Sequence, residues 1–147
     1  MSLIERLNED MKQAMKSQDK FRLSVIRMVR SSIKNAEIER QKPLDDNEVI
    51  DILQREVKQR KDSLQDFEKA GRSDLAADAS KEIAILQEYL PQQLSEEEIV
   101  EIVKQTMQET GAATKADMGR LMGALMPKVK GRADGKIVNR IAQQLLQ

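Results

Sequence analysis

The chain contains no cysteine and no histidine, and only three of its 147 residues are aromatic. Without these side chains it cannot form disulfides, thiolate or imidazole metal sites, Ser-His-Asp or Cys-His triads, or histidine proton relays. Most familiar enzyme chemistries are thereby excluded, and we expect no metal and no other cofactor. A core with so few aromatics must use aliphatic residues and the eight methionines, which pack well between helices. The composition therefore favours an all-α protein.

Long apolar runs and an excess of one charge are also missing. No segment approaches the roughly 20 apolar residues of a membrane span, and the start MSLIERLNED lacks the features of a signal peptide. We therefore expect a cytoplasmic protein with no membrane partner. Basic and acidic residues number 25 each, which argues against a globally basic nucleic-acid binder. Any basic surface must be local.

What the sequence does contain is helical periodicity, with apolar residues every three to four positions. Four helices are predicted before Pro91. Their starts are marked, in order, by the capping box Ser2-x-x-Glu5, by Asp19, by Asp46, and by Ser73 or Asp74. The second, third and fourth are expected to end near Gln41, Gly71 and Leu90. Together they predict a four-helix N-terminal domain over residues 1–92.

Three further helices are predicted after the linker PQQL at residues 91–94. Their starts are marked by Ser95, by the box Thr114-x-x-Asp117, and by Asp134. Gly111 is expected to end the first of them and Pro127 the second. They predict a small three-helix C-terminal domain over residues 93–147, so the whole chain is predicted to be all-α.

The C-terminal domain is strongly polarised in charge. Residues 95–110 carry a net charge of −4, whereas from residue 115 onward the net charge is +5. Basic side chains gather at the turn between the last two helices, where they can contact a phosphate backbone together. The candidate RNA-binding residues are Lys128, Lys130, Arg132, Lys136 and Arg140.

The same turn also has a purely structural interpretation. Gly131 can supply a left-handed helix stop, Asp134 can cap the last helix, and the cations can neutralise the preceding helix C-terminus. The Asp134 carboxylate would also occupy the amide donors of the last helix, so an anion would have to bind beside the cap. Both interpretations stay open from the sequence alone.

A weaker basic face is predicted on the second helix, either as an auxiliary RNA contact or as an ordinary solvated surface. Its residues are Lys20, Arg27, Arg30 and Lys34. The charged residues of the third helix, Arg60 among them, are interpreted as surface ion pairs. Gly119 and Gly123 lie on one side of their helix, which suggests close approach of another helix or a groove for a backbone.

Several stretches resemble the YqeY-like, or GatB/YqeY, family. The resemblance covers essentially the whole chain and is most specific in YLPQQL at residues 89–94 and in residues 119–139. In that family the C-terminal part is similar to the tail domain of the tRNA-dependent amidotransferase B subunit. The shared pattern stands here at Gly119, Met122, Gly131, Ala133, Val138 and Asn139.

The resemblance implies a tRNA-binding or tRNA-associated adaptor with no catalytic residues to carry over. The family-level activity is a carbon-nitrogen ligase with glutamine as amido-N-donor, to which this chain would be at most an accessory. We therefore expect tRNA or another structured RNA as partner, and a translation-related protein complex as a further one. The alternative is a protein–protein interaction module without RNA binding.

Overall fold

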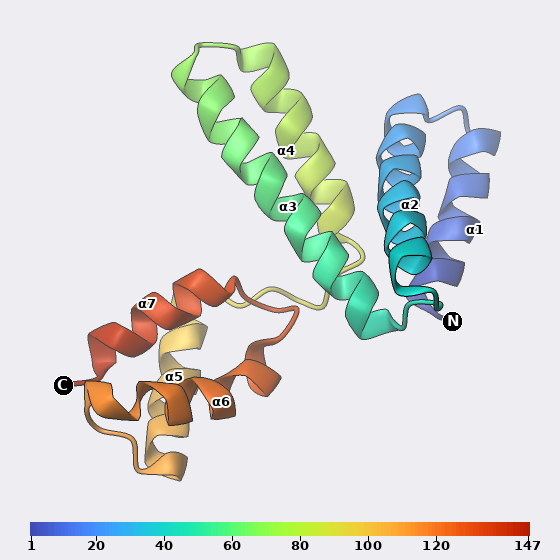
Figure 1. Cartoon of the computed structure of the whole chain (residues 1–147). Coiled ribbons are helices and arrows are strands. Elements are labelled where there is room, and N and C mark those ends of the chain that lie inside the picture. Colours follow the sequence, from blue (N-terminus) through green and yellow to red (C-terminus); the bar gives the residue numbers. More distant parts are fainter. The chain divides into compact units, whose positions relative to one another are not determined.

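The computed structural model describes all residues from 1 to 147 and contains helices only (Figure 1). Seven α-helices and one short 3₁₀ helix are present, and there is no strand, which confirms the predicted all-α class. The chain forms two compact units, Met1–Leu90 and Pro91–Gln147. Helices α1 to α4 belong to the first unit and α5 to α7 to the second, and each unit is described by itself.

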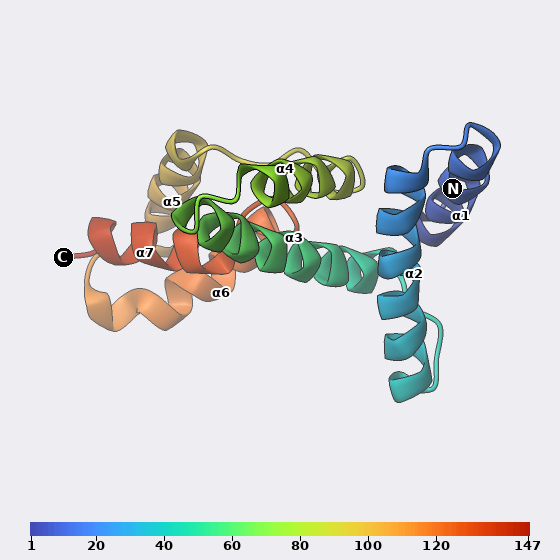
Figure 2. The same cartoon turned by 90° about the horizontal axis from the view of Figure 1, so that it is seen from above.

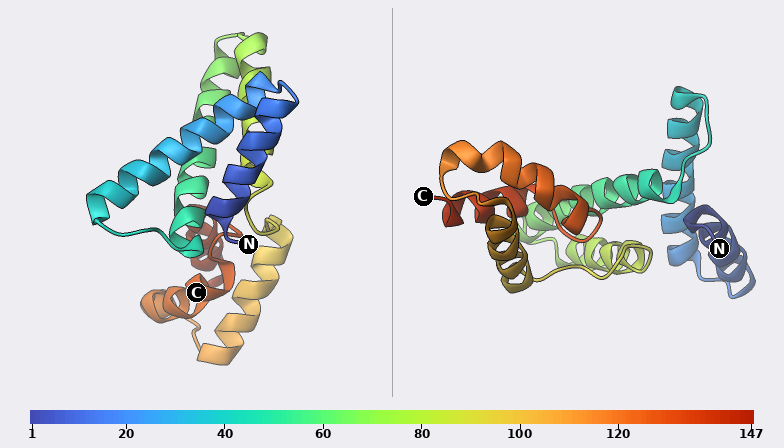
Figure 3. Two further views of the ribbon diagram at one scale, coloured as in Figure 1. Left: turned by 90° about the vertical axis from the view of Figure 1, so that its right-hand side faces the viewer. Right: turned by 90° about the horizontal axis from the view of Figure 1, so that it is seen from below.

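The first unit is built from two helical hairpins. One pairs α1 (Leu3–Lys16) with α2 (Lys20–Arg40), and the other pairs α3 (Asp46–Lys69) with α4 (Ser73–Gln87). Figures 2 and 3 show α2 lying beside α1 and crossing α3. The apolar faces meet in one core whose most buried large side chains are Leu7, Val25, Ile26, Val29, Val49, Leu53 and Leu86.

Two helix starts in this unit differ from the sequence prediction. Asp45, rather than Asp46, caps α3 and forms a capping box with Glu48. The Asp46 carboxylate instead accepts a hydrogen bond at 3.0 Å from the Leu3 amide, so it joins the starts of α3 and α1. No side chain caps α4, because its N-cap residue is Arg72, and the predicted caps Ser73 and Asp74 lie inside the helix, where Asp74 pairs with Arg72 at 3.2 Å. The spacing of Asp45 and Glu48 was present in the sequence, whereas the contact between Asp46 and Leu3 depends on the fold.

The second unit packs α5 (Glu96–Thr110), α6 (Met118–Val129) and α7 (Gly135–Leu145) against one another. Its core contains Val103, Leu121, Leu125, Val138 and Ala142, all fully buried. The predicted helix start at Ser95 is confirmed, and Ser95 forms a capping box with Glu98. The predicted capping box at Thr114 is also present, although it opens the 3₁₀ helix Lys115–Asp117 instead of α6 itself.

Two predictions about α6 are wrong. Pro127 does not close the helix, which continues to Val129, because a proline costs a single backbone bond and the Lys130 amide still donates to the Met126 carbonyl at 3.0 Å. Gly119 and Gly123 do not admit a neighbouring helix, since a Cβ at either would meet nothing within 4 Å. Both lie on the exposed side of α6, opposite its buried leucines.

Candidate nucleic-acid interface

The turn between α6 and α7 is fixed by hydrogen bonds from the linker. Gly131 has a φ of +76°, which confirms the predicted left-handed stop. Its carbonyl accepts from the Gln93 side chain at 2.8 Å, and the Arg132 carbonyl accepts from the Leu94 amide at 2.8 Å. Arg132 Nε in turn donates to the Gln92 carbonyl at 3.2 Å. Three consecutive linker residues therefore hold the turn in one conformation.

Asp134 caps α7, as the sequence predicts. Its Oδ1 accepts a hydrogen bond from the Lys136 amide at 2.9 Å. That carboxylate places negative charge at the helix start and repels an anion approaching the remaining amides. An anion at this turn must therefore be held by side chains. Lys130 and Lys136 are exposed here and Arg132 is half-buried.

The two outer members of the predicted set are engaged with the acidic helix α5. Lys128 Nζ lies 2.7 Å from a Glu109 carboxylate oxygen and 2.9 Å from Thr106 Oγ1. Arg140 Nη2 lies 2.7 Å from Glu96. These pairs tie α6 and α7 to α5 and neutralise part of the charge asymmetry that the sequence suggests. The structure thus brings Lys130, Arg132 and Lys136 together on one turn and assigns the other two to pairs within the unit.

The cations of the weaker basic face on α2 are not neutralised by nearby carboxylates. Lys20, Arg27 and Lys34 are exposed and have no carboxylate within ion-pair distance. Arg30 donates from Nε to Asn8 Oδ1 at 2.8 Å and contacts Met11 Sδ at 3.0 Å, both of which are neutral. None of the four cations of this face is therefore paired with an acid, whereas Arg22 and Arg40 of the same helix pair with Glu88 and Glu48.

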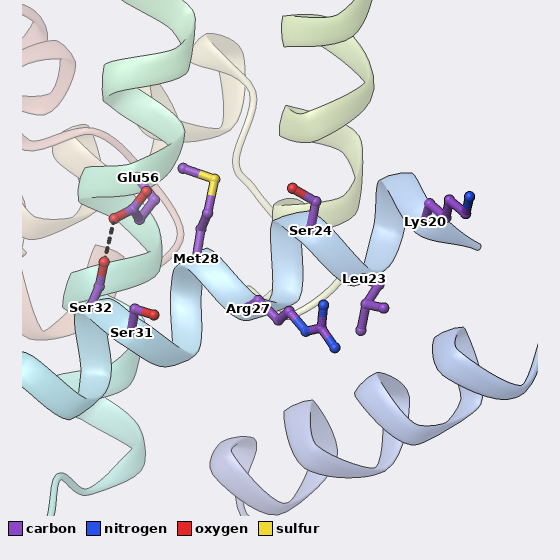
Figure 4. A pocket seen from close by; sticks show the side chains of 8 residues that line it. All are labelled: Lys20, Leu23, Ser24, Arg27, Met28, Ser31, Ser32 and Glu56. Carbon is purple, nitrogen blue, oxygen red and sulfur yellow. Dashed lines mark hydrogen bonds between the residues drawn. The ribbon is translucent and has the colours of Figure 1, made fainter. Parts of the chain in front are cut away.

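A shallow hollow of about 790 Å³ lies along the same helix (Figure 4). Seven of its lining residues come from α2 and one from α3: Lys20, Leu23, Ser24, Arg27, Met28, Ser31, Ser32 and Glu56. Figure 4 shows Ser24 and Met28 along one edge of the helix and Leu23 and Arg27 along the other. Sequence reasoning identified the cations here but not the apolar side chains between them.

A buried ionic network beside this hollow corrects the surface interpretation of α3. Arg60 is only 7% exposed. It donates to Glu56 at 2.5 Å on its own helix and to Glu82 of α4 at 2.8 Å, and Ser32 of α2 donates to Glu56 at 2.9 Å. The spacing of Glu56 and Arg60 was visible in the sequence, whereas Glu82 and Ser32 are brought in only by the fold.

Tyr89, the chain's single tyrosine, is also buried, with 3% of its surface exposed. Its hydroxyl donates to the Asp10 carboxylate, and the Arg6 guanidinium lies 4.6 Å from the centre of its ring. Burial, together with the hydrogen bond to Asp10, raises the pKa of Tyr89 well above its ordinary value of 10.0. These contacts join α1 to the residues that follow α4.

Two kinds of feature, clusters of metal-binding side chains and membrane-spanning helices, would indicate a metal or membrane site. Nowhere do three or more His, Cys, Asp or Glu residues gather in an arrangement that could hold a metal ion. None of the helices combines the length and the apolar character needed to cross a bilayer. The arrangement supports binding through charged and apolar surfaces.

Comparison with known proteins gives one family over nearly the whole chain. The sequence profile of the family described as Yqey-like protein matches residues 4–146. A relative from Pyrenophora tritici-repentis is 31% identical over 149 aligned residues, which cover 98% of this chain and 81% of the relative. Its name is altered inheritance of mitochondria protein 41, mitochondrial.

Two yeast relatives of the same name match a shorter part of the chain. The protein of Lachancea thermotolerans is 41% identical over 90 residues, covering 60% of this chain and 48% of the relative. That of Kluyveromyces lactis is 41% identical over 87 residues, covering 58% and 47%. The chain thus spans about half the length of these two relatives. Their names place them in mitochondria and do not support the expected cytoplasmic location.

Proposed function

Because this chain belongs to the YqeY-like family, whose C-terminal part resembles a tRNA-contacting tail, we propose that it is a non-catalytic adaptor for tRNA or another structured RNA. The contact is the turn that carries Lys130, Arg132 and Lys136. The observation that carries this proposal is the brace from Gln92, Gln93 and Leu94, which fixes the backbone of the turn that carries these three cations.

Phosphate contact accounts for this turn better than base recognition does. Single-stranded bases are usually recognised by stacking on exposed aromatic rings. Here Tyr89 is buried, Phe21 and Phe67 are half-buried, and all three lie outside the second unit. Lysine and arginine on a rigid turn instead suit the phosphates and the shape of a folded RNA. Binding should therefore depend weakly on RNA sequence and strongly on salt.

The similarity to the amidotransferase tail suggests where such an adaptor acts. We place it beside a glutamine-dependent amidotransferase or another translation-related complex, where it would help to hold tRNA while other subunits supply the chemistry. Addition of the chain to a purified amidotransferase should then increase amide formation on misacylated tRNA. An unchanged rate at saturating protein would remove this part of the proposal.

The cellular compartment of the chain follows from the proposed partner. The chain would act where tRNA is present, either in the cytoplasm, as its own sequence predicts, or in mitochondria, as the names of its relatives indicate. Fractionation of cells that express the tagged full chain distinguishes the two.

We also propose that residues 1–92 and 93–147 fold independently, which circular dichroism of each segment alone would test.

The direct test of RNA binding is a titration of the full chain with bulk tRNA at several salt concentrations. Each phosphate contact should contribute roughly 0.7 to 0.9 to the slope of log affinity against log salt. The variant Lys130→Glu/Lys136→Glu should weaken binding at least about tenfold, since each reversal replaces an attraction by a repulsion.

The matched control is Lys61→Glu/Lys69→Glu, which makes the same change in net charge at two exposed α3 lysines without ion pairs. If both variants weaken binding equally, only overall charge matters and the turn is not the site. If tRNA does not bind at low salt, RNA binding is refuted. The alternative, a protein-interaction module without RNA binding, would then explain the chain better.

A further inference from the structure

The outer face of α2 has the pattern of a helix that lacks its partner. Small, polar or apolar residues follow it at alternating steps of four and three, the spacing of a coiled-coil seam. They are Ser24, Met28, Ser31, Asn35 and Ile38. All five are exposed, and the two large apolar side chains, Met28 and Ile38, expose 49% and 65% of their surface. The Met28 sulfur accepts a hydrogen bond from Arg60 of α3 at 3.7 Å, but about half of the Met28 surface stays open.

One flank of this seam carries charge of a single sign. Lys20, Arg27 and Lys34 are spaced by seven residues, or about 10.5 Å along the helix. In heptad terms they occupy the position before Phe21, Met28 and Asn35, a flanking position that selects partner helices by charge. The other flank turns into the core, beginning with the buried Val25. A partner would therefore meet three unpaired cations along one edge.

The hollow on α2 shows how closely a partner could approach. Ser24 and Ser31 have short side chains, which leave room for a helix backbone beside Met28 (Figure 4). The single carboxylate in the hollow, Glu56, is engaged by Arg60 and Ser32 and so does not cancel the cations. The lining thus combines two apolar side chains, Leu23 and Met28, with two cations, Lys20 and Arg27. An RNA backbone could contact the cations Lys20 and Arg27, but it would leave the apolar Met28 and Ile38 without a contact.

We propose that this face of α2 docks an acidic amphipathic helix of a partner protein. The partner's apolar residues would cover Met28 and Ile38, and its acidic residues would pair with Lys20, Arg27 and Lys34. A second copy of this chain does not fit through its acidic helix α5, whose apolar residues Ile99 and Val103 are buried in their own unit. The inference does not depend on RNA binding by the turn between α6 and α7.

The experiment uses the ¹⁵N-labelled full chain and a synthetic helical peptide of about three heptads, the length of α2. The peptide carries leucine at the seam positions and glutamate at the flanking ones, and a matched peptide carries lysine in place of glutamate. The acidic peptide should shift the amide resonances of α2 with a dissociation constant on the order of ten micromolar, since the apolar contact is small. The lysine peptide should not bind.

Two variants assign the interaction to this face. Arg27→Glu/Lys34→Glu should weaken acidic-peptide binding about tenfold, whereas the equally charged Lys61→Glu/Lys69→Glu on α3 should leave it unchanged. The uncharged variant Ile38→Ser should weaken binding several-fold and retain the charge preference. Arg27, Lys34 and Ile38 are all exposed, so circular dichroism should show intact helices.

Three results would overturn the proposal. The first is an acidic peptide that shifts no α2 resonance, or a lysine peptide that binds as well. The second is an RNA hairpin that shifts the α2 resonances where the acidic peptide does not, which would make the face a phosphate site. The third is self-association of the chain that Ile38→Ser abolishes, which would make the occupant a second copy.

Discussion

Replacement of the buried Arg60 by leucine should destabilise the first unit more than replacement of any exposed cation on its helix. Arg60 is 7% exposed and bonds to Glu56 at 2.5 Å and Glu82 at 2.8 Å. Removal of one partner of a buried ion pair costs about 3–5 kcal/mol because the remaining charge is left uncompensated. Glu82 is 30% exposed and can turn toward water, so we expect the lower end, about 3 kcal/mol.

The assay is equilibrium denaturation followed by tyrosine fluorescence. The chain has one tyrosine, Tyr89, and no tryptophan, so the signal reports on the first unit alone. A loss of about 3 kcal/mol corresponds to a midpoint lower by roughly 10–20 °C for a unit of this size. Arg55→Leu is the matched control, since Arg55 is exposed on the same helix without an ion pair. Its effect should stay within about 0.5 kcal/mol.

A second variant isolates the electrostatic cause. In Arg60→Leu/Glu56→Gln the stranded carboxylate becomes a neutral amide that can still accept a hydrogen bond from Ser32. This variant should recover about half of the lost stability or more, because only the partly exposed Glu82 keeps its charge. The reasoning is refuted if Arg60→Leu costs no more than Arg55→Leu. It is also refuted if the double variant is as unstable as the two single changes added together.

Two further predictions concern pH and backbone conformation. The raised pKa of Tyr89 means that its contribution to stability is complete below pH 10.0, the ordinary tyrosine pKa, and is lost as pH rises toward the folded-state pKa. Alkaline denaturation of wild type and Tyr89→Phe, followed by circular dichroism, should show this loss in the wild type alone, and parallel curves would contradict it. In α6, Gly119→Ala and Gly123→Ala should each stabilise the second unit by about 0.5–1 kcal/mol, since both sites are open helix positions. Gly131→Ala should destabilise it by about 1–2 kcal/mol, because φ is +76° there. Thermal denaturation of the three variants measures both effects, and a stabilised Gly131→Ala would contradict the strain argument.

Helix ends were predictable where the chemistry is local. Ser2 and Ser95 each form a capping box with the glutamate three residues later, and the sequence contains both partners. Prediction failed where a distant residue competes for the same group. Asp46, the predicted cap, bonds instead to Leu3 across 43 residues, whereas the actual cap, Asp45, forms with Glu48 a box whose spacing is already present in the sequence. Periodicity within one helix holds no information about such a partner.

The candidate RNA-binding turn likewise has features that the sequence predicts and others that depend on the fold. The basic turn and its left-handed glycine follow from the order of residues after α6, and both were predicted. The pairs of Lys128 with Glu109 and of Arg140 with Glu96 join residues 19 and 44 positions apart. They exist because α5 packs against both α6 and α7. The sequence therefore could not show that Lys128 and Arg140 are paired with acidic residues of α5.

By itself, the sequence determined that this protein is helical, that it lacks thiol and imidazole chemistry, and where most of its helices begin and end. These properties depend on composition and on groups within one turn of each other. Only the tertiary structure decided that Arg60 is buried, that Gly119 faces open space, and that Lys20, Arg27 and Lys34 stay unpaired. Burial and ion pairing depend on which helix faces come together, and that choice is made by the packing of the whole unit.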